Sequence, residues 1–384
     1  MANLKPLKVG LVLDDGLDSP DGVQQYMLTL GQWLTQEGHD VYYLVGQTSR
    51  QDIPQLYSLS QNITVKFNGN RLGTIPLPTS HRKLKELLKH HDFDVLHVQA
   101  PFSPFMGGKL IKFAGPDTAI VGTFHIAPNS LLVSIANRLL GIWCYHSIKR
   151  IDILLSVSSA AQSFASNTFH RSSTIVPNVI DSNRFQNAET LNDYNGVTKN
   201  ILFLGRLVPR KGVRLLIDAA ARLKQMTEIP HFRVLICGRG PLLDELRRSA
   251  NRQGLGQDII FTGFVSEADK PRYYASADIT VFPSSGGESF GIVLLEAMAS
   301  GRSAVLAGNN PGYASVLAQR PKLLFDPHDP SALASTLAFY LTHEEEREAE
   351  ALWGKQYVKA FDIKQVGPKI VKIYYQTLLK RAGQ

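Results

Sequence analysis

Short apolar runs alternate with segments of helical pattern along almost the whole chain, and the alternation restarts near residue 200. Such runs are typical of parallel strands that helices cover on both faces. In the first half they occupy Lys8 to Leu13, Asp40 to Val45, Val95 to Val98, Ala119 to Thr123, Ile153 to Ser158 and Thr174 to Pro177. In the second half they occupy Asn200 to Leu204, Arg233 to Cys237, Asp258 to Thr262, Ile279 to Phe282 and Ser303 to Leu306. The pattern predicts an α/β chain with two Rossmann-like, doubly wound parallel-sheet domains in series.

The length of 384 residues fits two domains of ordinary size. We expect residues 1–178 to form an N-terminal domain and residues 179–357 a C-terminal domain, joined through the polar stretch Asn178 to Lys199. The tail from Glu344 to Arg381 is helical in pattern, and we expect a helix over 358–384 to return to the N-terminal domain. A ligand is expected in the cleft between the two domains.

Composition narrows the setting of the protein. The two cysteines, Cys144 and Cys237, lie far apart in apolar surroundings, which indicates neither disulfides nor a zinc site and suits a reducing cytoplasm. The start of the chain lacks the apolar core of a signal peptide, and no apolar run approaches the roughly 20 residues of a spanning helix, so any contact with a membrane is expected to be peripheral. The net charge of +8 favours phosphate-bearing partners without choosing among nucleic acid, anionic lipid and a charged small substrate.

The segment from Gly286 to Gly301 carries two carboxylates around an expected helix start. The glycines allow close approach of a ligand, Ser289 is a good N-cap, and the first-turn amides would face an anion. Gly301 is expected to end the helix. Glu296 lies among apolar residues, where burying its charge is costly unless hydrogen bonds reach it, and the two hydroxyls of a ribose would supply them. The segment therefore predicts a site for an anionic, hydroxyl-rich ligand that Glu288 and Glu296 bracket.

A second loop, Phe203 to Gly212, follows the first strand of the C-terminal domain and carries Arg206, Arg210 and Lys211. Ligands of open α/β sheets bind at the carboxyl ends of strands, so these cations suit a diphosphate. The alternative is a solvated basic loop, the more common case for a single Arg or Lys.

Together these motifs resemble the retaining GT-B glycosyltransferases of the large family that contains sucrose synthase, glycogen synthase-like enzymes and bacterial phosphatidylinositol mannosyltransferases. The resemblance covers almost the whole chain and implies two Rossmann-like domains facing across a cleft, the first binding the acceptor and the second the nucleotide-sugar. It implies that Glu288 faces the donor sugar, Glu296 the ribose, and Arg206 and Lys211 the diphosphate. The amides around the remaining donor residues would contact the sugar and phosphates: Ser289, Phe290, Gly291 and Ile292.

The resemblance also assigns residues of the N-terminal domain. Gly22 would bring the backbone close to the diphosphate, although Asp21 replaces the first of the family's two adjacent glycines. An ordinary turn glycine is the alternative. His125, at the end of a strand, would lie beside the reacting sugar and hydrogen-bond it. His97 ends the neighbouring strand, and Gln99 stands where the family often has a second histidine.

Three positions concern the nucleotide base. Gly238 ends a strand, and the spacing from Val265 to Lys270 matches mannosyltransferases that bind guanine. This resemblance favours GDP-mannose over a UDP-sugar. The alternative for Lys270 is a loop lysine without a ligand.

The segment Thr79 to His91 predicts an amphipathic helix with Leu84, Leu87 and Leu88 on one side. It resembles the basic helix by which phosphatidylinositol mannosyltransferases dock on anionic lipid, although a solvated basic surface helix is the common alternative. The residues expected to contact the acceptor or the membrane are Arg71, His81, Arg82, Lys83, Lys85 and Lys89. Arg71 would hold an acceptor phosphate.

We therefore expect a retaining, metal-independent hexosyltransferase that moves mannose from GDP-mannose to a lipid such as phosphatidylinositol, peripherally bound at the cytoplasmic membrane face. Nucleotide-sugar and anionic lipid are the expected partners, with no cofactor and no nucleic acid. The enzyme alternatives are a UDP-sugar-dependent transferase acting on another lipid, a soluble sugar or a polysaccharide, and a nucleotide-sugar epimerase. A dinucleotide oxidoreductase lacks its glycine fingerprint after Lys8 to Leu13. A catalytically silent lipid- or glycan-binding protein is the remaining alternative, which the presence of both glutamates disfavours.

Overall fold

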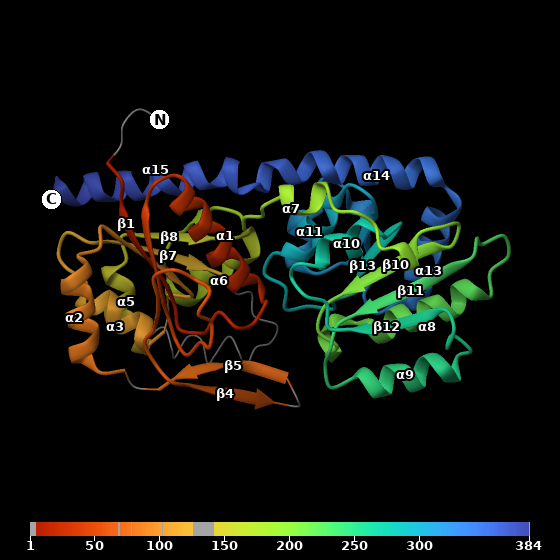
Figure 1. Cartoon of the computed structure of the whole chain (residues 1–384), viewed down its shortest axis with the longest axis horizontal. Helices are drawn as coiled ribbons and strands as arrows, with labels where there is room; N and C mark the ends of the chain where they lie inside the picture. The colour runs from red at the N-terminus through yellow and green to blue at the C-terminus, as the bar shows by residue number, and fades with distance from the viewer. Residues whose placement is uncertain (1–4, 68–69, 78, 102, 126–141, 384) are drawn as a thin grey trace. The chain divides into compact units, whose positions relative to one another are not determined.

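The computed structural model describes residues 5–67, 70–77, 79–101, 103–125 and 142–383, with the backbone alone for residues 64–67 and 70–76. The chain divides into two compact units (Figure 1). Unit 1 comprises Met1–Val179 and Ile363–Gln384, and unit 2 comprises Ile180–Asp362. The boundaries drawn from the sequence, 178/179 and 357/358, lie one and five residues away from these. The segment 358–362 therefore belongs to unit 2 instead of unit 1.

Unit 1 is built on a parallel sheet of seven strands in the order β3-β2-β1-β6-β7-β8-β9. Their bounds are β1 Lys8–Leu13, β2 Asp40–Val45, β3 Leu56–Ser58, β6 Val95–Gln99, β7 Ala119–Phe124, β8 Ile153–Ser156 and β9 Thr174–Ile175. Strand β1 pairs in parallel with β2 on one side and β6 on the other. Because β1, β6 and β7 run parallel to one another, their carboxyl ends share one edge of the sheet.

Helices cover both faces of this sheet, and residues of β1 alternate between the two cores. Val9 and Leu11 pack with α1 (Gly22–Gln36) and α15 (Ile363–Ala382). Val12 packs on the opposite face with α2 (His81–His91), α3 (Met106–Phe113) and α5 (Tyr145–Arg150). This period of two is that of a strand buried on both faces, which is why its sequence reads as a continuous apolar run. Helix α6 is Ser159–Phe169, and a separate antiparallel hairpin pairs β4 (Asn62–Phe67) with β5 (Asn70–Pro76).

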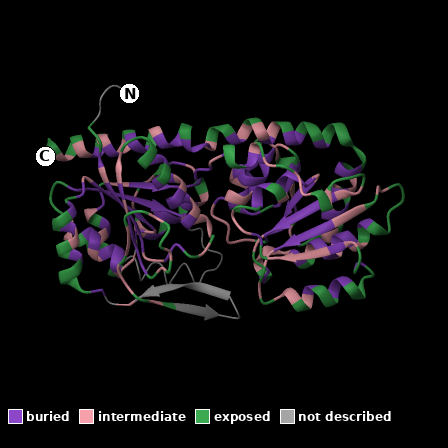
Figure 2. Ribbon diagram, in the orientation of Figure 1, coloured by how far each residue is buried: buried purple, intermediate pink, exposed green. Residues whose placement is uncertain are grey.

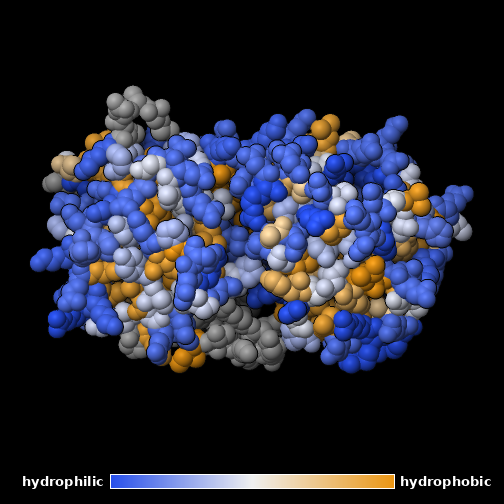
Figure 3. All heavy atoms as spheres, in the orientation of Figure 1, coloured by the Kyte–Doolittle hydropathy of each residue, from blue (hydrophilic) through white to orange (hydrophobic). Residues whose placement is uncertain are grey.

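Unit 2 repeats the plan with a six-stranded parallel sheet in the order β12-β11-β10-β13-β14-β15. The strands are β10 Lys199–Leu204, β11 Phe232–Cys237, β12 Ile259–Gly263, β13 Ile279–Phe282, β14 Ala304–Gly308 and β15 Leu324–Phe325. The helices are α7 Asn183–Gln186, α8 Val213–Lys224, α9 Leu243–Arg252, α10 Lys270–Ala275, α11 Ile292–Ser300, α12 Pro311–Val316, α13 Pro330–Thr342 and α14 Glu344–Tyr357. Strands β10, β13 and β14 are almost wholly buried (Figure 2), whereas the outer side of α9 is strongly hydrophilic (Figure 3).

The α/β class with two doubly wound parallel sheets is confirmed, and each predicted run overlaps a strand of one of them. The sequence did not predict β3, β15 or the β4–β5 hairpin. Strands β3 and β15 are edge strands of two or three residues, which leaves little pattern to read, although the equally short β9 was predicted. The hairpin carries no continuous apolar run because it lies outside the two large sheets.

Candidate functional site

The carboxyl edge of the unit 2 sheet holds the basic loop after β10. The loop turns through the 3-10 helix Pro209–Lys211 and ends at Gly212, whose φ of 69° places it in the left-handed region. A Cβ atom at Gly212 would lie 1.9 Å from the Pro283 carbonyl oxygen, so only glycine allows this close approach to the end of β13. The loop thus brings Arg210 and Lys211 to the segment that follows β13.

Glu288 is the partner of both cations. Its Oε1 accepts from Arg210 Nη1 at 2.5 Å, from Lys211 Nζ at 2.8 Å and from the Ser284 hydroxyl at 2.9 Å. Burial alone would raise the pKa of Glu288, but the charges of Lys211 and Arg210 outweigh it and lower the pKa below its usual value. Glu288 is therefore an ionised carboxylate held firmly in place.

Lys211, unlike Glu288, lies in surroundings that disfavour its charged form, because its pKa is lowered from the usual value. Its burial lowers its pKa, Glu288 raises it, and the neighbouring charges of Arg210 and Arg206 lower it again. Glu288 thus pairs with two cations, and the charge of the exposed Arg206 also acts on Lys211. An anionic ligand would relieve the remaining repulsion among them.

The helix start lies two residues later than Ser289, which corrects one prediction. The N-cap of α11 is Gly291 with φ of 113°, and Gly301 ends the helix in the left-handed region as predicted. A Cβ atom at Gly291 would lie 2.6 Å from the Tyr313 ring, so this turn requires glycine both for its backbone and for its packing. Phe290 is buried against Phe361. In the first turn of α11, the Leu294 amide donates to the Gly291 carbonyl at 3.0 Å.

Glu296 lies in α11 and is 4% exposed. The protein itself already supplies partners for this buried carboxylate, and its contact with a ribose stays a prediction. Tyr274 donates its hydroxyl to Glu296 Oε2 at 3.0 Å, and Lys270 Nζ lies 3.5 Å from Oε1. Burial raises the pKa of Glu296 despite the charge of Lys270.

Lys270 joins two carboxylates. Its Nζ lies 2.6 Å from Glu267 Oε1 as well as beside Glu296, and the residue is 6% exposed. Burial alone would lower the pKa of Lys270, but Glu296 and Glu267 together raise it. Lys270 is thus a buried ammonium shared by two carboxylates, and a contact with a nucleotide base stays a prediction.

The other two base positions have structural features of their own. Gly238 has φ of 152°, its amide donates to the Gly263 carbonyl at 2.7 Å, and a Cβ atom there would lie 1.8 Å from the Gly205 carbonyl oxygen. Val265 is buried. Both positions lie directly after strands, at the carboxyl edge where ligands bind in sheets of this kind.

In unit 1, His125 follows the end of β7 and is buried. Its Nε2 is 2.7 Å from Gln99 Oε1, and its ring meets the Tyr26 ring edge-on with centroids 4.9 Å apart. Gln99 thus replaces a second histidine with an acceptor that fixes the orientation of His125. Burial lowers the pKa of His125 to about 3, so the imidazole is neutral at physiological pH.

His97 lies deeper and connects β6 to the tail of the chain. Its Nδ1 is 2.7 Å from the Tyr374 hydroxyl of α15, and its Nε2 is 2.6 Å from the Thr123 hydroxyl of β7. Burial lowers the pKa of His97 to about 3. This network of neutral groups reaches Thr123, two residues before His125 in the chain. It gives His97 a structural role.

Gly22 opens α1, and Asp21 is the N-cap of that helix. Asp21 accepts a hydrogen bond from the Ser19 hydroxyl at 2.8 Å. The carboxylate that replaces the family's first glycine is therefore occupied by a neighbouring side chain.

The basic helix is α2, and its apolar side packs into the unit 1 core. Leu84 is fully buried and Leu88 is 8% exposed. The five predicted contact residues of this helix are all exposed: His81, Arg82, Lys83, Lys85 and Lys89. Arg82 pairs with Glu86 at 2.7 Å, and the side chain of Arg71 in β5 lies outside the described residues.

Sequence reasoning missed Arg210, Ser284 and Tyr274. Arg210 stands in the same basic loop as Arg206. The sequence showed that this loop carries three cations, but it did not show which of them reaches Glu288. Ser284 and Tyr274 come from other loops and helices, and no local pattern marks them.

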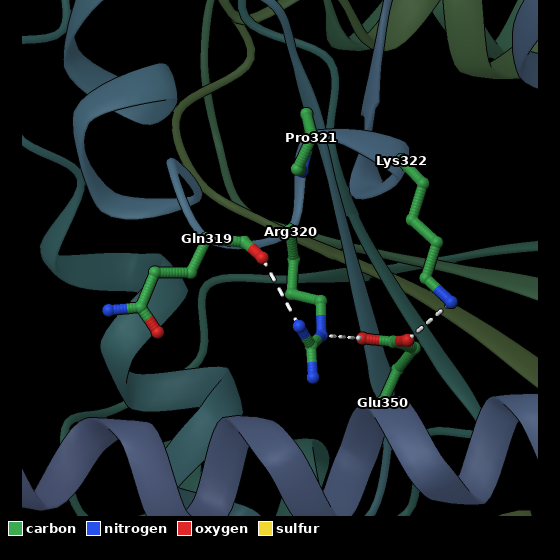
Figure 4. Close-up of a pocket in the computed structure, with 5 residues that line it drawn as sticks. All are labelled: Gln319, Arg320, Pro321, Lys322 and Glu350. Carbon is green, nitrogen blue, oxygen red and sulfur yellow. Dashed lines mark hydrogen bonds and ion pairs between the residues drawn. The ribbon is translucent and has the colours of Figure 1, made fainter.

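A hollow lined by Gln319, Arg320, Pro321, Lys322 and Glu350 lies on another part of unit 2 (Figure 4). The buried Glu350 pairs with Lys322 at 2.8 Å and with Arg320 at 3.4 Å, so its charges are largely satisfied internally. Across the described ranges, no group of three His, Cys, Asp or Glu side chains could hold a metal ion. Nor does any helix in the described part of the chain have the length and apolarity needed to cross a membrane.

Known proteins resemble this chain in both units. Residues 20–184 match the model of Glycosyltransferase Family 4, and residues 190–352 match that of Glycosyl transferases group 1. A phosphatidyl-myo-inositol mannosyltransferase of Mycobacterium tuberculosis is 33% identical over 377 residues, covering 96% of each chain. A GDP-mannose-dependent alpha-(1-6)-phosphatidylinositol monomannoside mannosyltransferase of the same organism is 27% identical over 305 residues, 74% of this chain and 76% of that relative. The crystal structure of a glycosyltransferase from Rickettsia africae matches with a TM-score of 0.76 at 16% identity, over 98% of this chain and 99% of that one, and the GT-B fold is confirmed.

Proposed function

The chain belongs to the glycosyltransferase family that includes the phosphatidyl-myo-inositol mannosyltransferases, and from this premise we propose that it transfers mannose from GDP-mannose to a phosphatidylinositol-type lipid. The chain and these relatives align over 96% of their lengths, which supports a shared activity. A relative at lower identity is named as GDP-mannose-dependent, which supports the choice of donor. We place the reaction at the cytoplasmic face of a membrane, with the protein bound peripherally.

One observation carries the donor side of this proposal: Arg210 and Lys211 both pair with the single carboxylate of Glu288, and the charge of Arg206 also acts on Lys211. A nucleotide diphosphate brings the negative charge that this group lacks. In such an arrangement Lys211 and Arg206 would bind the diphosphate, and Glu288 would be left to accept hydrogen bonds from sugar hydroxyls.

We propose that transfer proceeds with retention and without a metal ion. The acceptor oxygen would form its bond to the anomeric carbon on the face from which the diphosphate leaves, while the bond from that carbon to the phosphate oxygen breaks. The acceptor proton would pass to the departing diphosphate, and Lys211 and Arg206 would stabilise its charge. These steps need no carboxylate as a nucleophile, which fits the pairing of Glu288 with cations.

His125 is proposed to bind the donor sugar as a neutral imidazole. Its pKa of about 3 leaves it without a proton to give as an acid at neutral pH. Gln99 and Asn178 both hydrogen-bond the ring and fix its orientation. The expected role is hydrogen bonding and orientation.

A donor screen tests the proposal. The purified protein would be given GDP-mannose, UDP-glucose or UDP-galactose, each with and without vesicles containing phosphatidylinositol, and released nucleotide and mannosylated lipid would be measured. We expect lipid-dependent release of GDP from GDP-mannose alone, and its loss in Glu288→Gln. Release of UDP from a UDP-sugar instead would establish the UDP-sugar alternative. If none of the three donors is turned over, the catalytically silent binding protein would be the alternative that remains.

The membrane side rests on the exposed cations of α2. Replacing Lys83, Lys85 and Lys89 by Glu should reduce sedimentation with anionic vesicles at least tenfold, since each basic residue near such a surface contributes about 1 kcal/mol. Donor affinity should not change. Equal binding of both proteins would remove α2 from the membrane contact.

A further inference from the structure

Helix α2 supplies charge to the surface of unit 1 but no apolar side chains. Leu84 and Leu88 pack against the sheet in the same core as Val12 and Leu96. An interfacial helix normally buries its apolar side in the lipid, and that side of α2 is already used within the fold. Charge alone gives weak attachment, so apolar contact with a bilayer has to come from other residues.

Three apolar side chains at the start of α5 are exposed together. Ile142 is 73% exposed, Trp143 is 72% exposed and Tyr145 is 50% exposed. We call these three residues the aromatic patch. The other large apolar side chains of unit 1 with comparable exposure, Ile63, Ile175 and Leu379, are isolated in the sequence and come from different elements. Single exposed apolar residues are common, whereas a cluster of this kind marks an interaction surface.

A cation lies on the aromatic patch, and ring contacts through α3 connect the patch to α2. Lys149 Nζ lies over the Tyr145 ring at 4.5 Å from its centroid. Phe105, just before α3, meets Trp143 with ring centroids 6.5 Å apart. At the other end of α3, Phe113 contacts both Lys85 and His81 of α2. Helix α3 therefore separates the aromatic patch from the basic helix by roughly 12 Å, the length of eight helical residues.

We propose that the aromatic patch inserts into the headgroup region of an anionic bilayer while α2 holds the phosphates of the same leaflet. Tryptophan and tyrosine favour this depth of a membrane, and one apolar and one basic element together give the two signals that stable attachment needs. We propose an anionic bilayer as the partner because this surface is basic. The basic residues are Lys149, Lys112 and the exposed cations of α2. The inference rests on the proposed lipid acceptor, since it names how the protein reaches that lipid.

Tryptophan fluorescence tests the inference in the full chain. Vesicles of phosphatidylcholine and phosphatidylglycerol would be prepared with and without brominated acyl chains, which quench only tryptophans that enter the bilayer. Trp33 is buried, so Trp143 should account for the quenching. We expect quenching in the wild type and in Trp353→Phe, and its loss in Trp143→Phe.

A binding measurement adds a second readout. Ile142→Ala combined with Trp143→Ala should lower partitioning onto these vesicles about tenfold, since each removes a large apolar side chain from the lipid. Ile175→Ala combined with Leu379→Ala is the control, a pair of exposed apolar residues elsewhere in the same unit, and should bind like the wild type. Unquenched fluorescence, or equal losses in both double variants, would overturn the inference.

The transferase proposal and the membrane inference can fail separately. Quenching and partitioning are read without any donor, so they decide the aromatic patch even in a protein that turns over no sugar nucleotide. Conversely, lipid-dependent GDP release by a protein whose Trp143 stays unquenched would keep the enzyme and reject the patch.

Discussion

The carboxyl edges of the two sheets are built from opposite chemistry. In unit 2 the carboxylates are paired with cations, Glu288 with Arg210 and Lys211 and Glu296 with Lys270. In unit 1 the two buried histidines are neutral, since the pKa values of His97 and His125 both lie near 3 and their partners are hydroxyls and amides.

This difference matches what each edge is proposed to bind. A diphosphate requires fixed positive charge, and unit 2 offers it with a surplus over its carboxylate. A sugar or polyol hydroxyl requires oriented neutral donors and acceptors, which unit 1 supplies without a charge that would hold an anion in the wrong place. The same doubly wound plan therefore serves two ligand chemistries through the residues that follow its strands.

The largest effect is expected at Glu288. Glu288→Gln removes the charge that positions Lys211 and Arg210, so kcat should fall by about 10² to 10³, the cost of losing one electrostatic contact at a reacting centre. Steady-state GDP release measures it. Glu344→Gln, an exposed carboxylate that pairs with Lys199, is the control and should keep full activity. Comparable kcat in the two variants would contradict the role of the ionised edge.

A second large effect concerns the stability of unit 2. Lys270→Met leaves Glu296 and Glu267 buried without their cation, and the free energy of unfolding should fall by about 3 to 5 kcal/mol. Urea unfolding measures the change. Lys199→Met removes a more exposed cation with partners Asp278 and Glu344, and should cost less than about 1 kcal/mol. If the two variants unfold at the same urea concentration, the buried ion pairs of Lys270 stabilise unit 2 no more than the exposed ion pairs of Lys199.

Acid should separate the two edges. Folded His97 and His125 bind protons only near pH 3, whereas unfolded histidine binds them near pH 6.5, so stability is lost as the pH falls below 6.5. Between pH 6.5 and 5 the loss should reach about 2 kcal/mol per histidine. The pKa of Glu288 is lowered, so its contribution should persist until the pH falls below 4.5.

Urea unfolding at several pH values checks this order. His97→Gln should flatten the slope between pH 6.5 and 5, and replacing the exposed His146 by Gln should leave the slope unchanged. In activity assays, the pH profile of wild-type kcat should show no change near pH 6.5 that is due to His125. A change near pH 6.5 that disappears in His125→Gln would show that this residue takes up a proton there, and would contradict the neutral histidine of unit 1.

The smallest effect tests the neutral network alone. Tyr374→Phe removes the hydroxyl that meets His97 Nδ1, and the free energy of unfolding should fall by about 1 to 2 kcal/mol. The adjacent Tyr375, whose hydroxyl bonds the exposed Lys5 carbonyl, is the control and should lose less in Tyr375→Phe. The order of these two values decides whether the buried network stabilises unit 1.

Much of the fold could be predicted from the sequence because parallel strands buried on both faces produce continuous apolar runs. Runs such as Lys8 to Leu13 and Ile279 to Phe282 coincide with β1 and β13. Short edge strands were predicted unevenly: β9 overlaps the run Thr174 to Pro177, whereas β15, which is also two residues long, was missed. The hairpin of β4 and β5 also lacks such a run.

The candidate site was predictable in outline but not in its pairings. Glycines with positive φ, Gly212 and Gly291, mark the turns that bring the ligand-facing loops together. Which side chain reaches a carboxylate depends on distant elements, so neither Tyr274 beside Glu296 nor Arg210 beside Glu288 could be identified from spacing. The N-cap at Gly291 instead of Ser289 depends on the packing of Tyr313, a residue of another helix.

Helix α15 has a consequence for the order in which the chain acquires its structure during synthesis. Unit 2 is complete once Asp362 has emerged from the ribosome, but unit 1 lacks Ile363–Gln384 until those residues have emerged as well. Tyr374 and Ile370 fill the interior between α1 and the sheet, so the first 179 residues must wait with that surface uncovered. The part of the chain that is made first is therefore expected to mature last, and a nascent chain stalled after residue 362 should expose an unfinished first unit to chaperones and proteases while its second unit is already folded.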